Sequence, residues 1–131
     1  MANKLTIRMV TPEGKKKEDQ AEILNVVTTS GAMGILPKHL PLVAVLEISH
    51  LNYRSDGKLF EYSISGGVMH VKKDEVLLLL ESFESKDEID FVRADMSRKR
   101  AEERLALKGP DIDVRRAEIS LKRALNRLNM K

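Results

Sequence analysis

The sequence contains no cysteine and no tryptophan, and aromatic residues make up only 4% of its 131 positions. Without cysteine, disulfides, thiolate chemistry and cysteine-based metal sites are excluded. Apolar runs such as Val76 to Leu80 are far shorter than the roughly 18 residues that a membrane-spanning helix needs. The N-terminal stretch "MANKLTIRMV" lacks the long apolar core of a secretory signal, so we expect a cytoplasmic protein.

The distribution of residue types along the chain indicates two differently built modules. With 42% hydrophobic and 33% charged residues, the composition is that of a soluble globular protein. Up to Glu84 the chain has 10 basic and 11 acidic residues, and after it 13 basic and 9 acidic. Eight of the ten arginines follow Glu84, whereas nearly all glycines, prolines and β-branched residues precede it. We therefore expect one module over 1–84 and another over 85–131.

The first module reads as β structure, because short runs rich in Val, Ile, Leu and Tyr alternate with turn signals. Asp56 and Gly57 form a typical hairpin turn, and "KKDE" at 72–75 a second polar turn, so we expect antiparallel pairing. Seven or more short strands fold as a β-sandwich or flattened barrel. The charged stretch at 15–19 is interpreted as a solvated loop. The predicted strands are 5–10, 22–29, 42–48, 50–54, 59–65, 67–72 and 75–82.

The second module has the pattern of a helical hairpin. Ser85 followed by Glu88 has the form of a capping box, and the chain then continues to Leu107 without Gly or Pro. "KGPD" at 108–111 ends this helix, and Asp111 is the predicted N-cap of a second one. A short turn between two helices makes them antiparallel.

Spacing on the second helix predicts two faces. A seam of apolar residues at intervals of three and four should face the first helix. The opposite face should carry basic residues over about three turns. The predicted seam is Val114, Ala117, Leu121, Leu125 and Leu128; the predicted basic face is Arg116, Ser120, Arg123 and Arg127.

The stretch "SGAMGILPKHLP" at 30–41 is unusual because it places large apolar side chains among glycines and prolines. Two prolines and two flexible glycines indicate a fixed turn. Its apolar residues, Met33, Ile35, Leu36 and Leu40, must be covered by the domain's own core or by a partner.

No pattern in the sequence supports catalysis or a metal site. The segment "GAMGILPK" does not satisfy the phosphate-loop motif. The three histidines, His39, His50 and His70, are far apart and lack a ligand cluster, and no nucleophile triad can be assembled. We therefore expect no catalytic residues and no metal.

The arginine-rich second module leaves three interpretations open. Nucleic-acid binding is disfavoured, because Phe91 is the only aromatic after residue 84 and acidic residues interrupt the basic ones. The arginines could simply form a solvated face with weak ion pairs. The preference for arginine over lysine instead favours bidentate binding of phosphate.

Several motifs together make the whole chain resemble the epsilon subunits of F-type rotary ATP synthases. The resemblance rests on the loop "GAMGILPKHLP", the double glycine at 66–67 within "SISGGVMHV", and "IDFVRA" at 89–94. The spacing of Arg123 and Arg127 also matches members that bind ATP. All these motifs occur in the order and the modules that the family implies.

The resemblance implies a non-catalytic rotor subunit of a proton-translocating ATP synthase. Its first module would dock on the gamma subunit and the ring of c subunits at the cytoplasmic face of the membrane. Met33, Ile35 and His39 would form the docking surface, while Leu36 and Leu40 would pack in the core.

The resemblance also implies regulation by the hairpin. The hairpin would be compact, or extended toward the alpha and beta subunits to restrain ATP hydrolysis. ATP would be a regulatory ligand that favours the compact form. The implied adenosine contacts are Ile89, Asp90 and Ala94; the implied phosphate contacts are Arg93, Arg123 and Arg127; Glu84 and Arg100 are possible neighbours. The alternatives are a stand-alone nucleotide-sensing module and a nucleic-acid adaptor.

Overall fold

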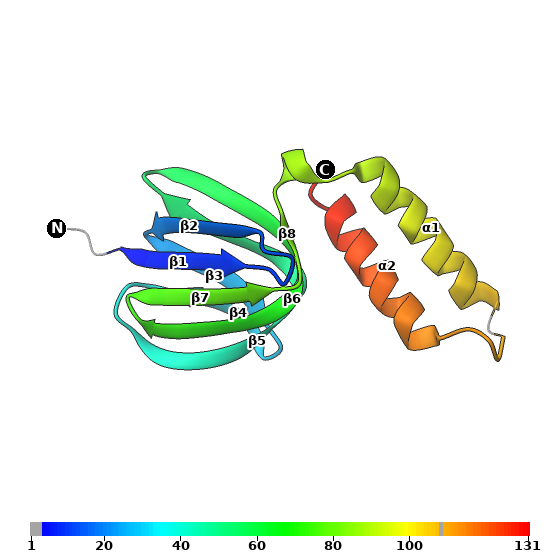
Figure 1. Cartoon of the computed structure of the whole chain (residues 1–131), viewed down its shortest axis with the longest axis horizontal. Helices are drawn as coiled ribbons and strands as arrows, with labels where there is room; N and C mark the ends of the chain where they lie inside the picture. Colours follow the sequence, from blue (N-terminus) through cyan, green and yellow to red (C-terminus); the bar gives the residue numbers. More distant parts are fainter. Residues whose placement is uncertain (1–3, 108) are drawn as a thin grey trace. The chain divides into compact units, whose positions relative to one another are not determined.

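The computed structural model describes residues 4–107 and 109–131, and it divides the chain into two compact units, Met1–Ser85 and Lys86–Lys131. The first unit is built of strands and the second of helices (Figure 1). The predicted fold, a β-sandwich followed by a two-helix hairpin, is confirmed. The strands are β1 Leu5–Val10, β2 Lys16–Ala21, β3 Ile23–Thr28, β4 Gly31–Ile35, β5 His39–Ser55, β6 Lys58–Lys73, β7 Glu75–Leu80 and β8 Phe83–Glu84.

The strands pair in the order β2-β1-β7-β6-β5-β3-β4, with β8 pairing β6. Most neighbours are antiparallel, and the predicted hairpin turn at Asp56 and Gly57 joins β5 to β6. Both turn residues have positive φ, 51° and 79°, which a tight hairpin of this kind requires. The expectation of purely antiparallel pairing is wrong, because β1 runs parallel to β7.

Two long strands replace the four that the sequence analysis separated at 42–72. Along the first part of β5 the even-numbered side chains Leu42, Ala44 and Leu46 point inward. Further along, the odd-numbered Ser49 and Leu51 do so instead. β6 makes the same change from even to odd positions at Gly66 and Gly67. A strand whose inward face changes in this way can contribute to both layers of a sandwich. The predicted breaks are therefore bends within continuous strands.

Two segments interpreted as loops are edge strands. The charged stretch 16–21 pairs with β1 as β2, and 31–35 pairs with β3 as β4. In β2, Lys17 and Asp19 point inward and Lys16 and Glu18 outward, so charged side chains occupy both faces. Hydrophobic alternation cannot detect such a strand, although charged edges are a common protection against edge-to-edge aggregation.

The sandwich encloses one core, to which β1, β3, β5, β6 and β7 all contribute. An aromatic cluster lies beside it: Tyr53 stacks on Phe60 and Tyr62 with ring centroids 5.2 and 6.2 Å apart. The ammonium of Lys17 lies over both Phe60 and Tyr62, and Tyr53 donates a hydrogen bond to Asp19. The inward charges of β2 are thus covered by rings and hydroxyls. The largest fully buried side chains are Tyr53, Phe83, Leu5, Ile7, Met9, Leu24, Ile35, Leu51, Ile64, Met69, Leu78 and Leu80.

The second unit contains a 3-10 turn, Lys86–Glu88, and two helices, α1 Phe91–Leu107 and α2 Val114–Leu128. Both predicted N-caps are wrong. The α1 cap is Asp90, whose Oδ1 accepts the Arg93 N–H at 3.0 Å, because the residues after Ser85 form the 3-10 turn instead. The α2 cap is Asp113, whose Oδ1 accepts the Arg116 N–H at 2.9 Å, so Asp111 belongs to the connection. Lys108, in the predicted turn, lies outside the described residues.

Alanines form the seam between the two helices. Ala94 and Ala101 on α1, and Ala117 and Ala124 on α2, are buried. Of the predicted seam residues only Ala117 is buried, and Val114 and Leu125 are exposed. The contact line on α2 follows Ala117 and Ala124, seven residues apart, because small side chains let helix backbones approach closely.

Candidate functional site

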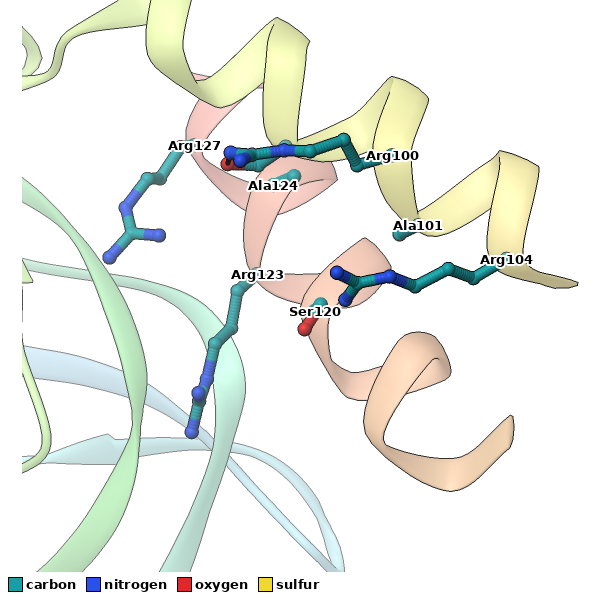
Figure 2. A pocket seen from close by; sticks show the side chains of 8 residues that line it. Arg100, Ala101, Arg104, Ser120, Arg123, Ala124 and Arg127 are labelled. Carbon is teal, nitrogen blue, oxygen red and sulfur yellow. Dashed lines mark hydrogen bonds between the residues drawn. The ribbon is translucent and has the colours of Figure 1, made fainter. Parts of the chain in front are cut away.

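A cavity of about 220 Å³ lies along the alanine seam of the hairpin. We call it the arginine cavity. Figure 2 shows Arg100 and Arg104 reaching from α1 toward α2, near Ala124 and Ser120. Arg123 and Arg127 start on α2 and point away from α1 (Figure 2). The cavity is lined by Ser97, Arg100, Ala101, Arg104, Ser120, Arg123, Ala124 and Arg127.

Helical spacing explains why these residues meet. Ser97, Arg100 and Arg104 lie three and four positions apart on α1, so they share one face. Ser120, Arg123 and Arg127 have the same spacing on α2. The predicted basic face therefore lies beside the seam and not opposite it, because the seam follows the alanines. Arg116 belongs to a second cavity with Arg104, Asp111, Ile112, Asp113 and Ala117.

Arg98 on α1 does not line the cavity and forms ion pairs with acidic residues of its own helix. Arg98 pairs with Asp95 at 2.7 Å and with Glu102 at 3.0 Å. These contacts raise the pKa of Arg98 and lower that of Asp95, chiefly through their mutual hydrogen bonds. By contrast, no acidic residue lines the arginine cavity. The cavity therefore has the chemistry of an anion site.

The structure gathers only some of the predicted ATP-binding residues in this cavity. Arg100, Arg123 and Arg127 line it. Asp90 caps α1, with Ile89 just before it and Arg93 and Ala94 in the first turn; none of these four lines the cavity. Glu84 belongs to β8 in the other unit. Ser97 and Arg104 were not predicted, although their spacing from Arg100 indicates a shared helix face.

The predicted docking segment is placed differently from our expectation. Ile35 is fully buried (0% exposed), while Leu36 and Leu40 are 55% and 80% exposed. Both expectations are therefore wrong: Ile35, predicted on the docking surface, lies in the core, and Leu36 and Leu40, predicted in the core, are exposed. Met33 and Ile35 lie opposite Val26 and Leu24 and share the inward face of β4, which turns Leu36 outward. Met33 and His39 are half-buried.

A second exposed feature is apolar and lies on the outer side of β5, β6 and β7. Val45 is the register partner of Val68, and Val68 of Leu79. Together with Val43 these exposed side chains form what we call the apolar face. A cavity of about 430 Å³ adjoins it, lined by Val10, Thr11, Pro12, Gly67, Val68, Leu79, Leu80 and Glu81. This face was not predicted from the sequence, because "LVAVLEI" is apolar on both sides and only the strand register shows which of its residues point outward.

Among the described residues we find neither a helix suited to crossing a membrane nor a group of His, Asp and Glu residues that could hold a metal ion.

Comparisons with known proteins agree across the whole chain. Residues 4–86 match the family model described as "ATP synthase, Delta/Epsilon chain, beta-sandwich domain". Residues 87–131 match "ATP synthase, Delta/Epsilon chain, long alpha-helix domain". An ATP synthase epsilon chain of Bacillus licheniformis is 41% identical over 108 residues, which are 82% of each chain.

Solved structures show the same fold at low sequence identity. A chain of the Euglena gracilis mitochondrial ATP synthase (OSCP/F1/c-ring) superposes with a TM-score of 0.80 at 22% identity, covering 94% of this chain and 78% of that one. A chain of the Tetrahymena thermophila mitochondrial ATP synthase central stalk and c-ring has a TM-score of 0.56 at 14% identity, with 67% and 71% covered.

Proposed function

Because the chain belongs to the ATP synthase delta/epsilon family, we propose that it is a rotor subunit in the central stalk of a proton-translocating ATP synthase. Epsilon chains are non-catalytic subunits of that complex. The observation that carries the proposal is the pair of adjoining family matches, which together span residues 4–131. In this role the subunit helps couple rotation of the c-ring to ATP synthesis, at the cytoplasmic face of the membrane.

The β-sandwich supplies the docking surface. The apolar face suits a protein partner, because docking removes its side chains from water at about 25 cal/mol per Å² before binding costs. We assign this face to gamma. The exposed Leu36 and Leu40, with the half-buried Met33 and His39, are assigned to the c-ring end of the same docking surface. Ile35 belongs to the core and takes no part.

The hairpin supplies regulation. Two helices held by alanines bury little apolar surface against each other, so the compact form is easily exchanged for an extended one. In the extended form the basic residues can meet the alpha and beta subunits and restrain ATP hydrolysis. A ligand that binds only the compact form shifts the balance by its differential affinity.

ATP is the proposed regulatory ligand, and the arginine cavity supports it. Arg100, Arg123 and Arg127 bind phosphates, with Arg93 at the α1 entrance. Ile89, Asp90 and Ala94 frame the adenosine.

Co-purification from detergent-solubilised membranes tests the rotor role. We expect this chain to elute with the much larger alpha, beta and gamma chains at a constant ratio. A stand-alone nucleotide sensor or a nucleic-acid adaptor would elute without them, and that result would contradict the proposal.

A further inference from the structure

The turn that joins β5 to β6 carries the only Asp-Gly pair in the sequence, Asp56 and Gly57. In such a pair the backbone nitrogen of the second residue can attack the side-chain carboxyl carbon of the first and close a five-membered imide ring. Glycine at the second position offers the least steric resistance, because it has no Cβ. Every other aspartate of the chain is followed by a residue with a side chain. The turn is therefore where this ring closes most readily.

The fold leaves both reacting groups of the turn open to solvent. The side chain of Asp56 is 82% exposed. Gly57 lies in the turn between the register partners Ser55 and Lys58, and its N–H donates no hydrogen bond to any described residue. Beyond its chain neighbours, no atom comes within 4 Å of a Cβ built on Gly57. The nitrogen is thus unoccupied, and the space around it is free for ring closure.

One contact opposes the reaction. The ammonium of Lys4, just before β1, lies 2.8 Å from the Asp56 Oδ1. Its hydrogen bond, and then its charge, lower the pKa of the Asp56 carboxyl. Ring closure expels a carboxyl oxygen as water, so it proceeds from the protonated carboxyl, and a lower pKa makes that form scarcer. Lys4 therefore slows the reaction.

We propose that Asp56 is a modification site, at which the chain converts spontaneously to isoaspartate at a rate that Lys4 limits. The Gly57 nitrogen loses its proton and bonds to the Asp56 Cγ, whose C–O bond breaks to release one water and leave the imide. Water then adds to one of the two imide carbonyls, and the C–N bond of that carbonyl breaks. Opening at Cγ restores aspartate, and opening at the backbone carbonyl gives isoaspartate. One water leaves and one returns, so no cofactor is required.

Isomerisation changes the turn and its link to β1. The backbone of isoaspartate passes through Cβ and Cγ, which adds one carbon to a tight turn built on positive φ at both positions, 51° and 79°. Its free carboxylate is bonded directly to Cα, so its position relative to Lys4 also changes. The modification therefore acts on the hairpin geometry and on the ion pair together, and it is independent of the proposed rotor role.

Peptide mapping of the full chain after incubation at neutral pH tests the proposal. Cleavage after glutamate releases peptide 48–61, in which chromatography and electron-transfer fragmentation separate the two isomers. We expect isoaspartate to accumulate at position 56, together with an imide lighter by one water. Lys4→Gln should speed its accumulation about two- to fivefold, the range that an exposed ion pair supports. Lys58→Gln removes the same charge beside the turn, from a lysine that does not pair with Asp56, and is the matched control.

Asp74, which precedes Glu75 in the turn between β6 and β7, is the internal control and should remain aspartate. Isoaspartate at position 56 in urea-unfolded chain but none in folded chain would show that the folded turn holds the reacting atoms apart, and it would overturn the proposal. Equal accumulation at Asp74 would also overturn it, because the turn would then have no special reactivity. Equal rates in Lys4→Gln and Lys58→Gln would overturn the role of Lys4.

Discussion

Gly67 illustrates how one residue decides the architecture of the sandwich. It lies where β6 changes its inward face, with a φ of 155°. A Cβ built on it would come within 2.2 Å of the Leu79 carbonyl oxygen on β7. Any side chain would therefore push β6 and β7 apart at the centre of the sheet. The double glycine of the sequence is required by this close approach of two backbones.

Gly67→Ala should destabilise the sandwich by more than about 3 kcal/mol, because backbone must move to relieve the clash. Gly14→Ala is the control: its φ of 96° is equally unusual, but no atom lies within 4 Å of the added carbon. That variant should lose only about 1 to 2 kcal/mol of conformational strain. Urea unfolding measures both, and equal losses would contradict the steric explanation.

Tyr53 makes the stability of the sandwich depend on alkaline pH. Burial, together with the hydrogen bond to Asp19, raises the pKa of its hydroxyl well above its ordinary value near 10. The folded state therefore favours the neutral phenol. Its contribution to stability is fully present below pH 10 and is lost as the pH rises above 10, where the unfolded chain releases the proton.

We expect the free energy of unfolding to fall above pH 10 by about 1.4 kcal/mol per pH unit from this group. Tyr53→Phe removes the group, so its unfolding free energy should fall less steeply over the same range. Urea unfolding at pH 9, 10 and 11 compares the two proteins. Identical slopes would show that Tyr53 does not titrate differently in the two states.

Capping decides where the helices begin, and its signals are ambiguous in this sequence. Three acidic residues, Asp87, Asp90 and Glu88, precede α1, and Asp111 and Asp113 precede α2. The structure uses Asp90 and Asp113, whose carboxylates accept the N–H three residues later. For α2, spacing to the apolar residues could not choose between Asp111 and Asp113, because they lie only two residues apart.

Asp113→Ala should destabilise α2 by about 1 kcal/mol, because the Arg116 N–H loses its acceptor. Asp111→Ala removes an equal charge two residues earlier and should leave the helix content unchanged. Circular dichroism at 222 nm during thermal melting of the full chain compares the variants. A larger loss from Asp111→Ala would mean that the cap is at Asp111 after all.

At the scale of the whole molecule, the sequence predicted the fold class, the hairpin turns and most strands. These follow from local patterns: alternation of apolar residues in strands, and spacing of three or four residues in helices. It could not predict β2, whose inward lysine and aspartate break the pattern, or the parallel pairing of β1 with β7, which is a long-range event. It also could not tell which of Ile35 and Leu36 is buried, since both are apolar and adjacent. That choice depends on pairing with β3.

The two candidate sites differ in how much of them the sequence predicted. Arg123 and Arg127 were found from their spacing on one helix, but their meeting with Ser97, Arg100 and Arg104 depends on which residues form the seam. The apolar face was not predicted, because it combines residues from three strands that only the register aligns. The apolar face lies on the first unit and the arginine cavity on the second, which suits the first unit for docking and the second for regulation.

The central claim is that the sandwich docks on the gamma subunit through the apolar face, and binding of purified gamma to the full chain tests it most directly. Val68→Asp places a charge at the centre of that face, where burial without a partner is costly, while leaving the core untouched. Leu59→Asp is the control, because Leu59 is an exposed residue of β6 outside the face, 54% exposed against 39% for Val68.

By surface plasmon resonance we expect the wild type and Leu59→Asp to bind gamma alike, and Val68→Asp to bind at least about a hundredfold more weakly with an unchanged melting temperature. Wild-type affinity in Val68→Asp, or no binding of gamma by the wild type, would contradict the account.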